Sequence, residues 1–174
     1  MKYVYALLFS VLLVSCASNS PAKVDSPQYE ALKKQVNSKK IAIESRIAYP
    51  MNSSGLTSVS NNGLLGRGNA ATAINLADNA NFVKIDGNSI ALHLPYFGNR
   101  TNWSYKEKDN SISYKGAISQ FRTKEKKKQI DIYFTFKKGI EEFTARIILY
   151  PNRTSRIEIQ SSHRSTIAYR GNLI

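Results

Sequence analysis

Short runs in which apolar and polar residues alternate follow one another from residue 41 to the end of the chain, and they constrain the fold more than any other feature. Successive side chains of a β-strand point to opposite faces, so a period of two predicts strands with one buried face. Ile90, Leu92 and Leu94 share one such face, whereas His93 lies on the other face and Pro95 ends the run. Comparable runs predict strands over residues 41–49, 74–76, 82–85, 90–94, 112–118, 130–136, 143–149, 157–159 and 167–169.

The first of these runs is expected to form a half-buried strand that stops at Pro50. Its alternation places Ile41, Ile43, Ile47 and Tyr49 on the same face, which is the face we expect to be buried. The stretch that follows, residues 52–72, is rich in Asn, Ser and Gly and shows no sustained period. We therefore predict a long loop there.

The connections between the runs are short and rich in turn-forming or charged residues. Asp86, Gly87, Asn88 and Ser89 together predict a tight hairpin turn. The other connections are expected at residues 109–110, 124–128, 137–139 and 151–152. Connections of this length join antiparallel neighbours, and no crossover helices separate the strands, so an antiparallel meander is favoured over a parallel α/β sheet.

One helix is expected before the strands. Ser26 followed by Pro27 is typical of a helix start, and Tyr29, Leu32 and Val36 follow at helical spacing. This narrow apolar stripe suits a helix that packs on a sheet. The predicted fold class is mostly β (α+β): one domain over residues 27–174, with the helix on an antiparallel meander that forms a curved sheet or a small open barrel or sandwich.

The N-terminal segment predicts export. Lys2 is followed by an apolar stretch over residues 4–14, which is too short to span a membrane and is typical of a signal peptide over residues 1–15. The segment ends in Leu-Val-Ser-Cys, which resembles a bacterial lipobox, and this resemblance implies a lipid on Cys16. Cys16 is the only cysteine in the chain, so it has no disulfide partner. Residues 16–26 would then be a flexible tether to the membrane.

A net charge of +13 at pH 7 raises nucleic acid as a partner, but two observations argue against it. An exported protein does not normally meet nucleic acid, and no basic helix or aromatic–basic motif concentrates the charge. Anionic lipid head groups, lipopolysaccharide phosphates and acidic glycans are more available partners.

An aromatic cluster follows the run that ends at Pro95. Tyr96, Phe97, Trp103 and Tyr105 lie close together in the sequence around a Gly-Asn-Arg turn, with Tyr114 nearby. Such a cluster can line a surface that binds sugar or lipid. Alternatively, the aromatic side chains fill the open end of a small β-core, and we favour this second interpretation.

Candidates for catalysis and for cofactor binding are few. The chain holds two histidines, His93 and His163, far apart in the sequence, so a metal site is not expected. The sequence contains no Gly-x-Gly-x-x-Gly, Walker loop or Gly-x-Ser-x-Gly element, and we expect no cofactor. A hydrolase that uses His93 or His163 is an alternative, but we expect a protein that is not an enzyme.

Several segments resemble a group of lipoproteins from Bacteroides-type bacteria that share domain of unknown function 4251. The most specific are Leu-Pro-Tyr-Phe-Gly at 94–98 and the closing Arg-Ser-x-Ile-x-Tyr-x-Gly element within 161–171. Further similarity lies at 74–76, 83–90 and 112–118, so that the resemblance covers about residues 27–174, although the stretch 52–70 is longer than expected. The resemblance implies a small, mostly β domain of the cell envelope and no assigned activity.

We therefore predict a lipid-anchored envelope protein that binds a ligand or scaffolds a complex. In the resembled group, acidic residues after the lipidated cysteine often mark export to the surface; residues 17–20 have none, which favours the periplasmic face of the outer membrane. One alternative is a binding module for an acyl, glycan or peptide ligand that uses the aromatic cluster. Another is an interaction protein that pairs with an envelope component, and this needs an exposed apolar patch or an open sheet edge.

Overall fold

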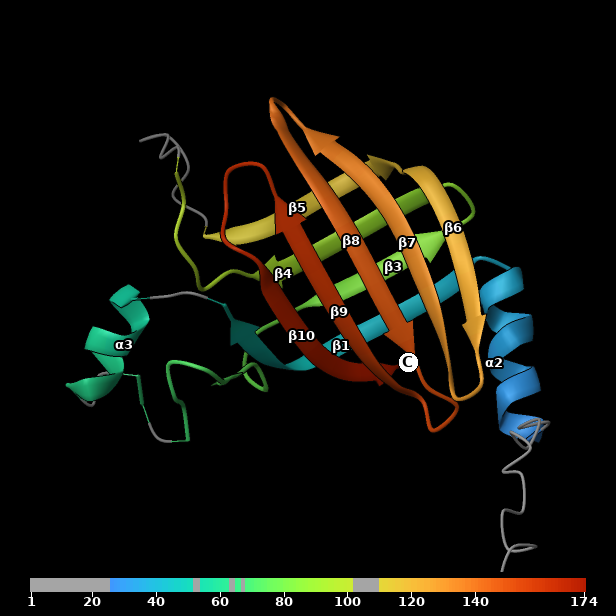
Figure 1. Ribbon diagram of the computed structural model, residues 1–174, viewed down its shortest axis with the longest axis horizontal. Coiled ribbons are helices and arrows are strands. Elements are labelled where there is room, and N and C mark those ends of the chain that lie inside the picture. Colours follow the sequence, from blue (N-terminus) through green and yellow to red (C-terminus); the bar gives the residue numbers. More distant parts are fainter. Residues whose placement is uncertain (1–25, 52–53, 63–64, 67, 102–109) are drawn as a thin grey trace, which may run out of the picture.

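The computed structural model describes residues 26–51, 54–62, 65–66, 68–101 and 110–174. Ten strands form one antiparallel sheet in the order β5-β4-β3-β1-β10-β9-β8-β7-β6, and β2 pairs with β1 beside this path. Figure 1 shows the sheet wrapped so that the strands β7 to β10 cross in front of β1, β3, β4 and β5. The strands are β1 (Lys40–Pro50), β2 (Ile74–Asn75), β3 (Phe82–Asp86), β4 (Ser89–Pro95), β5 (Ser111–Ala117), β6 (Ser119–Lys126), β7 (Gln129–Lys138), β8 (Glu141–Leu149), β9 (Thr154–Ser161) and β10 (Ile167–Leu173).

The two outermost strands of the sheet are consecutive in the sequence. β5 and β6 are the outermost strands, and only Ile118 separates them in sequence. The sheet is therefore nearly closed, like a barrel, and its inner face supplies the core. Ile43, Leu94, Ile132 and Phe143 are all fully buried there. The predicted fold class is confirmed.

Helix α2 (Pro27–Asn37) covers one end of the sheet (Figure 1). The Ser26 side chain accepts a hydrogen bond from the Tyr29 backbone N–H at 3.2 Å, which is the predicted N-cap. Tyr29, Leu32 and Val36 are buried, as predicted. The Tyr29 hydroxyl also donates to the backbone carbonyl of Lys126 at 2.9 Å, so the helix covers part of the outer edge of β6.

Strand β6 was not among the predicted strands. Residues 124–128 were expected to form a connection, but residues 124–126 extend the strand and the turn lies at residues 127–128. An outermost strand that is exposed on both faces needs no apolar alternation, and most residues of β6 are exposed. The period-two signal that predicts strands is therefore missing here.

Strand β1 changes its buried face part of the way along. Its pairing with β10 shifts between Ser45 and Ile47, which leaves Arg46 as an extra residue, a β-bulge. Ile41 and Ile43 are buried as predicted, but beyond the bulge the alternation is reversed. The prediction that Ile47 and Tyr49 share the buried face is therefore wrong: both lie on the outer face, and Ala48 and Pro50 point inward.

The bulge has identifiable causes in the neighbouring strands. Gly171 on β10 faces Ser45, and a Cβ atom at Gly171 would lie 2.6 Å from the Ser45 Cα and even closer to the Glu44 carbonyl oxygen. On the other side of β1, the Asn81 side chain accepts from the Ser45 N–H at 2.7 Å and donates to its carbonyl at 2.9 Å. Ser45 lies between the part of β1 that pairs with β3 and the part that pairs with β2. The Asn81 side-chain amide therefore satisfies the Ser45 N–H and carbonyl, which no strand pairs on this side.

The region predicted as a loop, residues 52–72, differs from that prediction over residues 54–61. These residues form helix α3 (Ser54–Asn61), which lies to one side of the sheet in Figure 1. Leu56 packs against the core, whereas Val59 is partly exposed. Two apolar residues are too few to make a periodic signal. Within the described ranges, no helix is both long enough and apolar enough to cross a membrane.

Candidate functional site

The predicted aromatic cluster is only partly described by the structure. The Tyr96 side chain is 1% exposed, and its hydroxyl donates to the backbone carbonyl of Asn99 at 2.8 Å and lies 2.9 Å from the Ser165 Oγ. Phe97 is half-buried and packs against the core. Tyr96 is thus a core residue with no surface for a ligand, whereas the predicted Trp103 and Tyr105 lie outside the described residues.

The two segments that carried the resemblance are held against each other. The buried Tyr169 hydroxyl donates to the Pro95 carbonyl at 2.8 Å, and the Ser165 N–H donates to the Asn99 carbonyl at 3.0 Å. Gly98 lies so close to the Tyr96 hydroxyl that a Cβ atom would overlap it. These segments, 94–98 and 161–171, therefore form one packed unit.

A buried ion pair joins the same unit to β8. The Arg164 side chain is 3% exposed, and its Nε donates to the Glu141 Oε1 at 2.8 Å. Burial alone would raise the pKa of Glu141, but the bonds from Arg164 and Ser161 outweigh this effect and lower the pKa. Arg164 also lies over the ring of Tyr96, 5.3 Å from its centroid. These contacts give the motif residues Tyr96, Arg164 and Tyr169 a structural role.

The two histidines contact serine hydroxyls. The His93 Nδ1 lies 2.8 Å from the Ser113 Oγ, and the His163 Nδ1 lies 2.9 Å from the Ser162 Oγ. Within the part of the chain that the structure describes, neither imidazole forms an ion pair or hydrogen bond with a carboxylate. The same described residues contain no group of three or more His, Cys, Asp or Glu side chains that could hold a metal ion. Cys16 is outside them.

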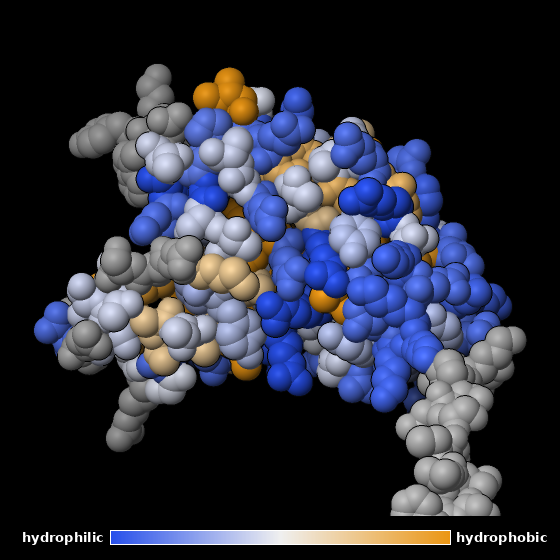
Figure 2. Space-filling view, viewed as in Figure 1, coloured by the Kyte–Doolittle hydropathy of each residue, from blue (hydrophilic) through white to orange (hydrophobic). Residues whose placement is uncertain are grey.

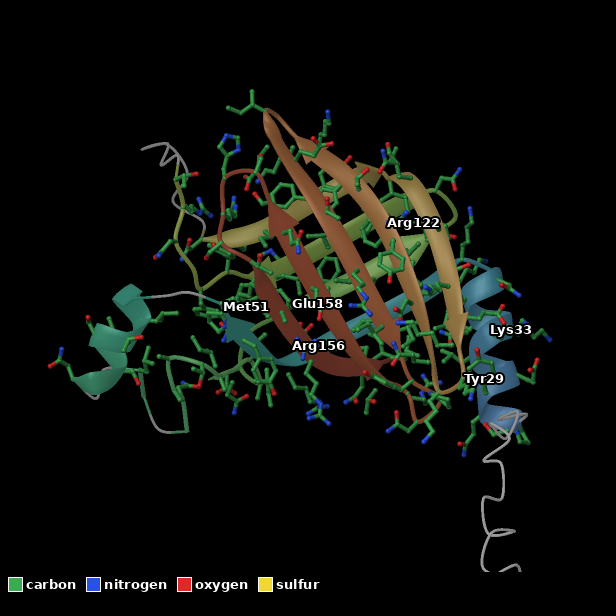
Figure 3. All side chains as sticks on the ribbon, viewed as in Figure 1. Tyr29, Lys33, Met51, Arg122, Arg156 and Glu158 are labelled. Atoms are coloured by element: carbon green, nitrogen blue, oxygen red, sulfur yellow. The ribbon has the colours of Figure 1, made fainter. Side chains whose placement is uncertain are left out.

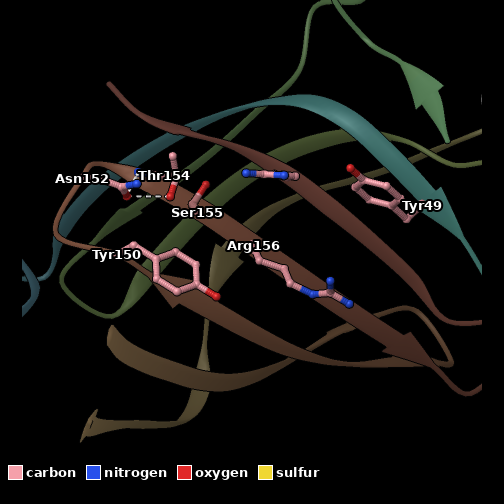
Figure 4. A pocket seen from close by; sticks show the side chains of 7 residues that line it. Tyr49, Tyr150, Asn152, Thr154, Ser155 and Arg156 are labelled. Carbon is pink, nitrogen blue, oxygen red and sulfur yellow. Dashed lines mark hydrogen bonds between the residues drawn. The ribbon is translucent and has the colours of Figure 1, made fainter. Parts of the chain in front are cut away.

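The strongest candidate site is a hollow on the outer face of β1, β10 and β9, which we call the arginine–tyrosine cleft. It has a volume of about 520 Å³. Figure 4 shows Arg156 lying between the rings of Tyr150 and Tyr49. The residues that line the cleft are Tyr49, Tyr150, Asn152, Thr154, Ser155, Arg156 and Arg170.

Three segments far apart in the sequence build this cleft. Arg170 on β10 pairs directly with Arg156 on β9, so the two guanidinium groups project from neighbouring positions. Tyr49 reaches the outer face only because the bulge reverses the alternation of β1. A second hollow, of about 210 Å³, shares Thr154 and Arg170 with the cleft and extends to Arg46.

The cleft and the second hollow beside it hold an excess of positive charge. Arg46 and Arg170 are exposed and form no hydrogen bond or ion pair with any described residue through their side chains. Arg156 uses its Nε on the Glu158 Oε1 at 2.8 Å, and Figure 3 shows these two side chains close together on β9. Its two terminal nitrogens have no described partner. The buried Ser155 hydroxyl has no described partner either.

A chain of ion pairs holds Arg156 in place. Glu158 also accepts from Arg146 at 3.3 Å, and Arg146 donates to the fully buried Asp131 at 2.8 Å. Lys126 donates to the same Asp131 oxygen at 2.7 Å. Burial of Asp131 alone would raise its pKa, but these cations together with Gln129 and Tyr133 lower it to about 2.

Sequence reasoning missed the arginine–tyrosine cleft. Arg156 and Arg170 stand at polar positions of their strands, where a solvated surface charge is the ordinary expectation. Only the strand order β1-β10-β9 and the bulge bring them beside Tyr49. Both residues lie just outside the strands predicted at 157–159 and 167–169, so no sequence signal marked them.

The comparisons with known proteins assign a family and no activity. No curated protein matches the sequence. One family model, described as "Domain of unknown function (DUF4251)", matches residues 23–173. Because this match covers nearly the whole described structure, both helices included, the chain belongs to the DUF4251 family.

Proposed function

We propose that this protein is a lipid-anchored, non-enzymatic binding protein of the bacterial cell envelope, and that its ligand is an anion held in the arginine–tyrosine cleft. The observation that carries the proposal is the meeting of Arg156, Arg170 and two tyrosine rings around one open hollow. A basic surface needs no ligand to be stable in water, but a shaped hollow in which several guanidinium nitrogens have no described partner is suited to one.

The residue types indicate the chemical class of the ligand. A guanidinium group binds phosphate or carboxylate through two parallel hydrogen bonds, and Arg170 has no described partner that competes for them. The faces of Tyr49 and Tyr150 suit the apolar side of a sugar ring. The volume of the cleft falls within the range of about 300–1,000 Å³ that is usual for small-molecule sites. We therefore infer a phosphorylated or acidic sugar.

Asn152 supports this assignment through its orientation. Its side-chain oxygen accepts hydrogen bonds from the Thr154 N–H at 3.1 Å and from the Thr154 hydroxyl at 2.7 Å. The amide nitrogen, which only donates, is left without a described partner. The donor groups around the cleft therefore outnumber the acceptors, as an anionic ligand requires.

Titration calorimetry tests the ligand class. Glucose 6-phosphate and a short oligogalacturonate are the anionic probes, and neutral glucose and a neutral oligosaccharide of equal length are their controls. We expect binding of an anionic probe only, weakened at least tenfold by Arg170→Ala. Arg122→Ala is the matched control, because Arg122 is exposed and stacks on Tyr133 outside the cleft. Equal loss in both variants, or equal binding of the neutral probes, would contradict the proposal.

The lipid anchor needs a separate test. We expect the protein expressed with its leader in a lipoprotein-processing bacterium to partition with membranes and to gain the mass of a diacylglyceryl group. Cys16→Ser should abolish both the added mass and the partitioning. An unmodified Cys16 in the mature protein would overturn this part of the proposal without affecting the cleft.

A further inference from the structure

We propose that the end of the domain that carries helix α2 lies against the anionic surface of the membrane, with the lysines of the β6–β7 turn in contact with lipid phosphates. We call this end, with Lys34, Lys124, Lys127 and Lys128, the basic end. The inference goes beyond the arginine–tyrosine cleft, because it concerns a different surface. It uses the proposed lipid anchor only to argue which end of the molecule faces the membrane.

The contacts of α2 place the helix and the lysines together. Tyr29 in the first turn of α2 bonds the Lys126 carbonyl, and Lys33 pairs with Glu125 at 2.9 Å. In Figure 1 the start of α2 and the β6–β7 turn lie at the same end of the molecule. Figure 2 shows hydrophilic side chains covering this region.

The charge at the basic end is not neutralised by ion pairs with the residues that the structure describes. Lys34, Lys124, Lys127 and Lys128 are all largely exposed, and none forms an ion pair with a described residue. The acids nearby are already engaged, because Glu125 pairs with Lys33 and Asp131 is buried beneath Lys126. Glu30 on α2 is the remaining described acid of the helix. Several unpaired cations within one hairpin and one helix turn are attracted to an anionic surface.

The point at which the tether joins the domain favours this end over the opposite one. The chain from Cys16 to Pro27 reaches at most about 40 Å when it is fully extended. Strand β7 separates the β6–β7 turn from the β7–β8 turn by about 33 Å. A lipid on Cys16 is therefore joined to the domain at the basic end. The tether is long enough to let either end reach the bilayer, and it is the lysines without an ion-pair partner among the described residues that select the basic end. The β7–β8 turn, with Lys137 and Lys138, is at the far end of the strand.

Vesicle sedimentation tests the surface without any lipid on the protein. The chain from residue 16 onward with Cys16→Ser keeps every residue of the folded domain. We expect it to bind vesicles with one-third phosphatidylglycerol and not vesicles of phosphatidylcholine, and 1 M salt should release it. Lys127→Gln with Lys128→Gln should weaken binding about 30-fold, since each lysine near such a surface contributes about fivefold.

The matched control is Lys137→Gln with Lys138→Gln, which removes the same charge from the opposite end. We expect this variant to bind as the parent does, and thermal unfolding should show both variants folded. If the control loses binding as much as the test variant, or if neutral vesicles bind equally well, the inference is overturned. Because this assay uses no acyl chain, its failure is distinguishable from an absent lipid on Cys16.

A second measurement examines the lipidated protein in vesicles. Mass spectrometry after brief acetylation reports how fast each lysine reacts. We expect Lys127 and Lys128 to react several times more slowly on anionic than on neutral vesicles, while Lys137 and Lys138 react at the same rate on both. Protection of Lys137 and Lys138 instead would place the opposite end on the membrane and refute the orientation.

Discussion

Substitution of Asp131 by asparagine should make the domain less stable at neutral pH and barely less stable in acid. Asp131 is fully buried, and its carboxylate accepts hydrogen bonds from Lys126 at 2.7 Å and Arg146 at 2.8 Å. These contacts help to lower its pKa from 3.8 to about 2. A difference of nearly two pKa units corresponds to about 2 kcal/mol of folding free energy at pH 7.

The sign of the pH dependence follows from the direction of the shift. Because the pKa is lower in the folded state, the stabilisation is complete well above the unfolded value of 3.8 and is lost as the pH falls towards 2. Near pH 3 about half of it should remain. The difference in unfolding free energy between the parent and Asp131→Asn should therefore shrink from about 2 kcal/mol at pH 7 to below about 0.7 kcal/mol near pH 2.

Urea denaturation followed by circular dichroism at pH 7, 5, 3 and 2 measures this difference. Glu142→Gln is the control, because Glu142 is 54% exposed and lies 3.6 Å from Lys137, so it should change stability by less than about 0.5 kcal/mol at every pH. A cost of Asp131→Asn that stays constant from pH 7 to pH 2 would refute the reasoning, since it would show that packing, rather than charge, accounts for the loss.

Three further substitutions test the fold by the same denaturation assay. Gly171→Ala should lower the free energy of unfolding by more than about 3 kcal/mol or prevent folding, because its Cβ atom would overlap the backbone of β1. Gly55→Ala is its control: a Cβ atom there would lie in open space, so the free energy of unfolding should change by less than about 1 kcal/mol. Tyr169→Phe should cost about 1–3 kcal/mol, because it removes the hydrogen bond to the Pro95 carbonyl; no change would indicate that water replaces the hydroxyl. Ser26→Ala should cost about 1 kcal/mol through the loss of the N-cap, and an unchanged midpoint would show that the first turn of α2 contributes little to stability.

Much of the fold follows from local pattern. The inward positions of β4, β7 and β8 were predicted correctly, because each strand has one buried face and its side chains alternate. The start of α2 was also predictable, because capping depends on residues adjacent in sequence. Strand β6 escaped prediction because most of its residues are solvated.

The candidate site depends on long-range geometry. Arg156 lies outside the sequence motifs, and Arg170 occupies an unspecified position of the closing element within 161–171. Their side chains become neighbours only because β9 and β10 pair in one register. Tyr49 joins them because an extra residue, Arg46, shifts the pairing of β1 with β10. A one-residue shift in a strand moves every later side chain to the opposite face, and no local pattern in β1 marks where that shift occurs.

Local signals along the chain were enough to predict one mostly β domain with a helix before its strands, and the N-terminal segment predicted the lipid on Cys16. Local propensities and alternation suffice for the fold class, since they depend on residues a few positions apart. The lipid on Cys16 stays a prediction that rests on the resemblance of residues 13–16 to a lipobox. The folded structure was needed to place Tyr96 in the core and to bring Arg156, Arg170 and Tyr49 around a common cleft. Both outcomes depend on strand order, register and a bulge, which arise from the packing of residues distant in sequence.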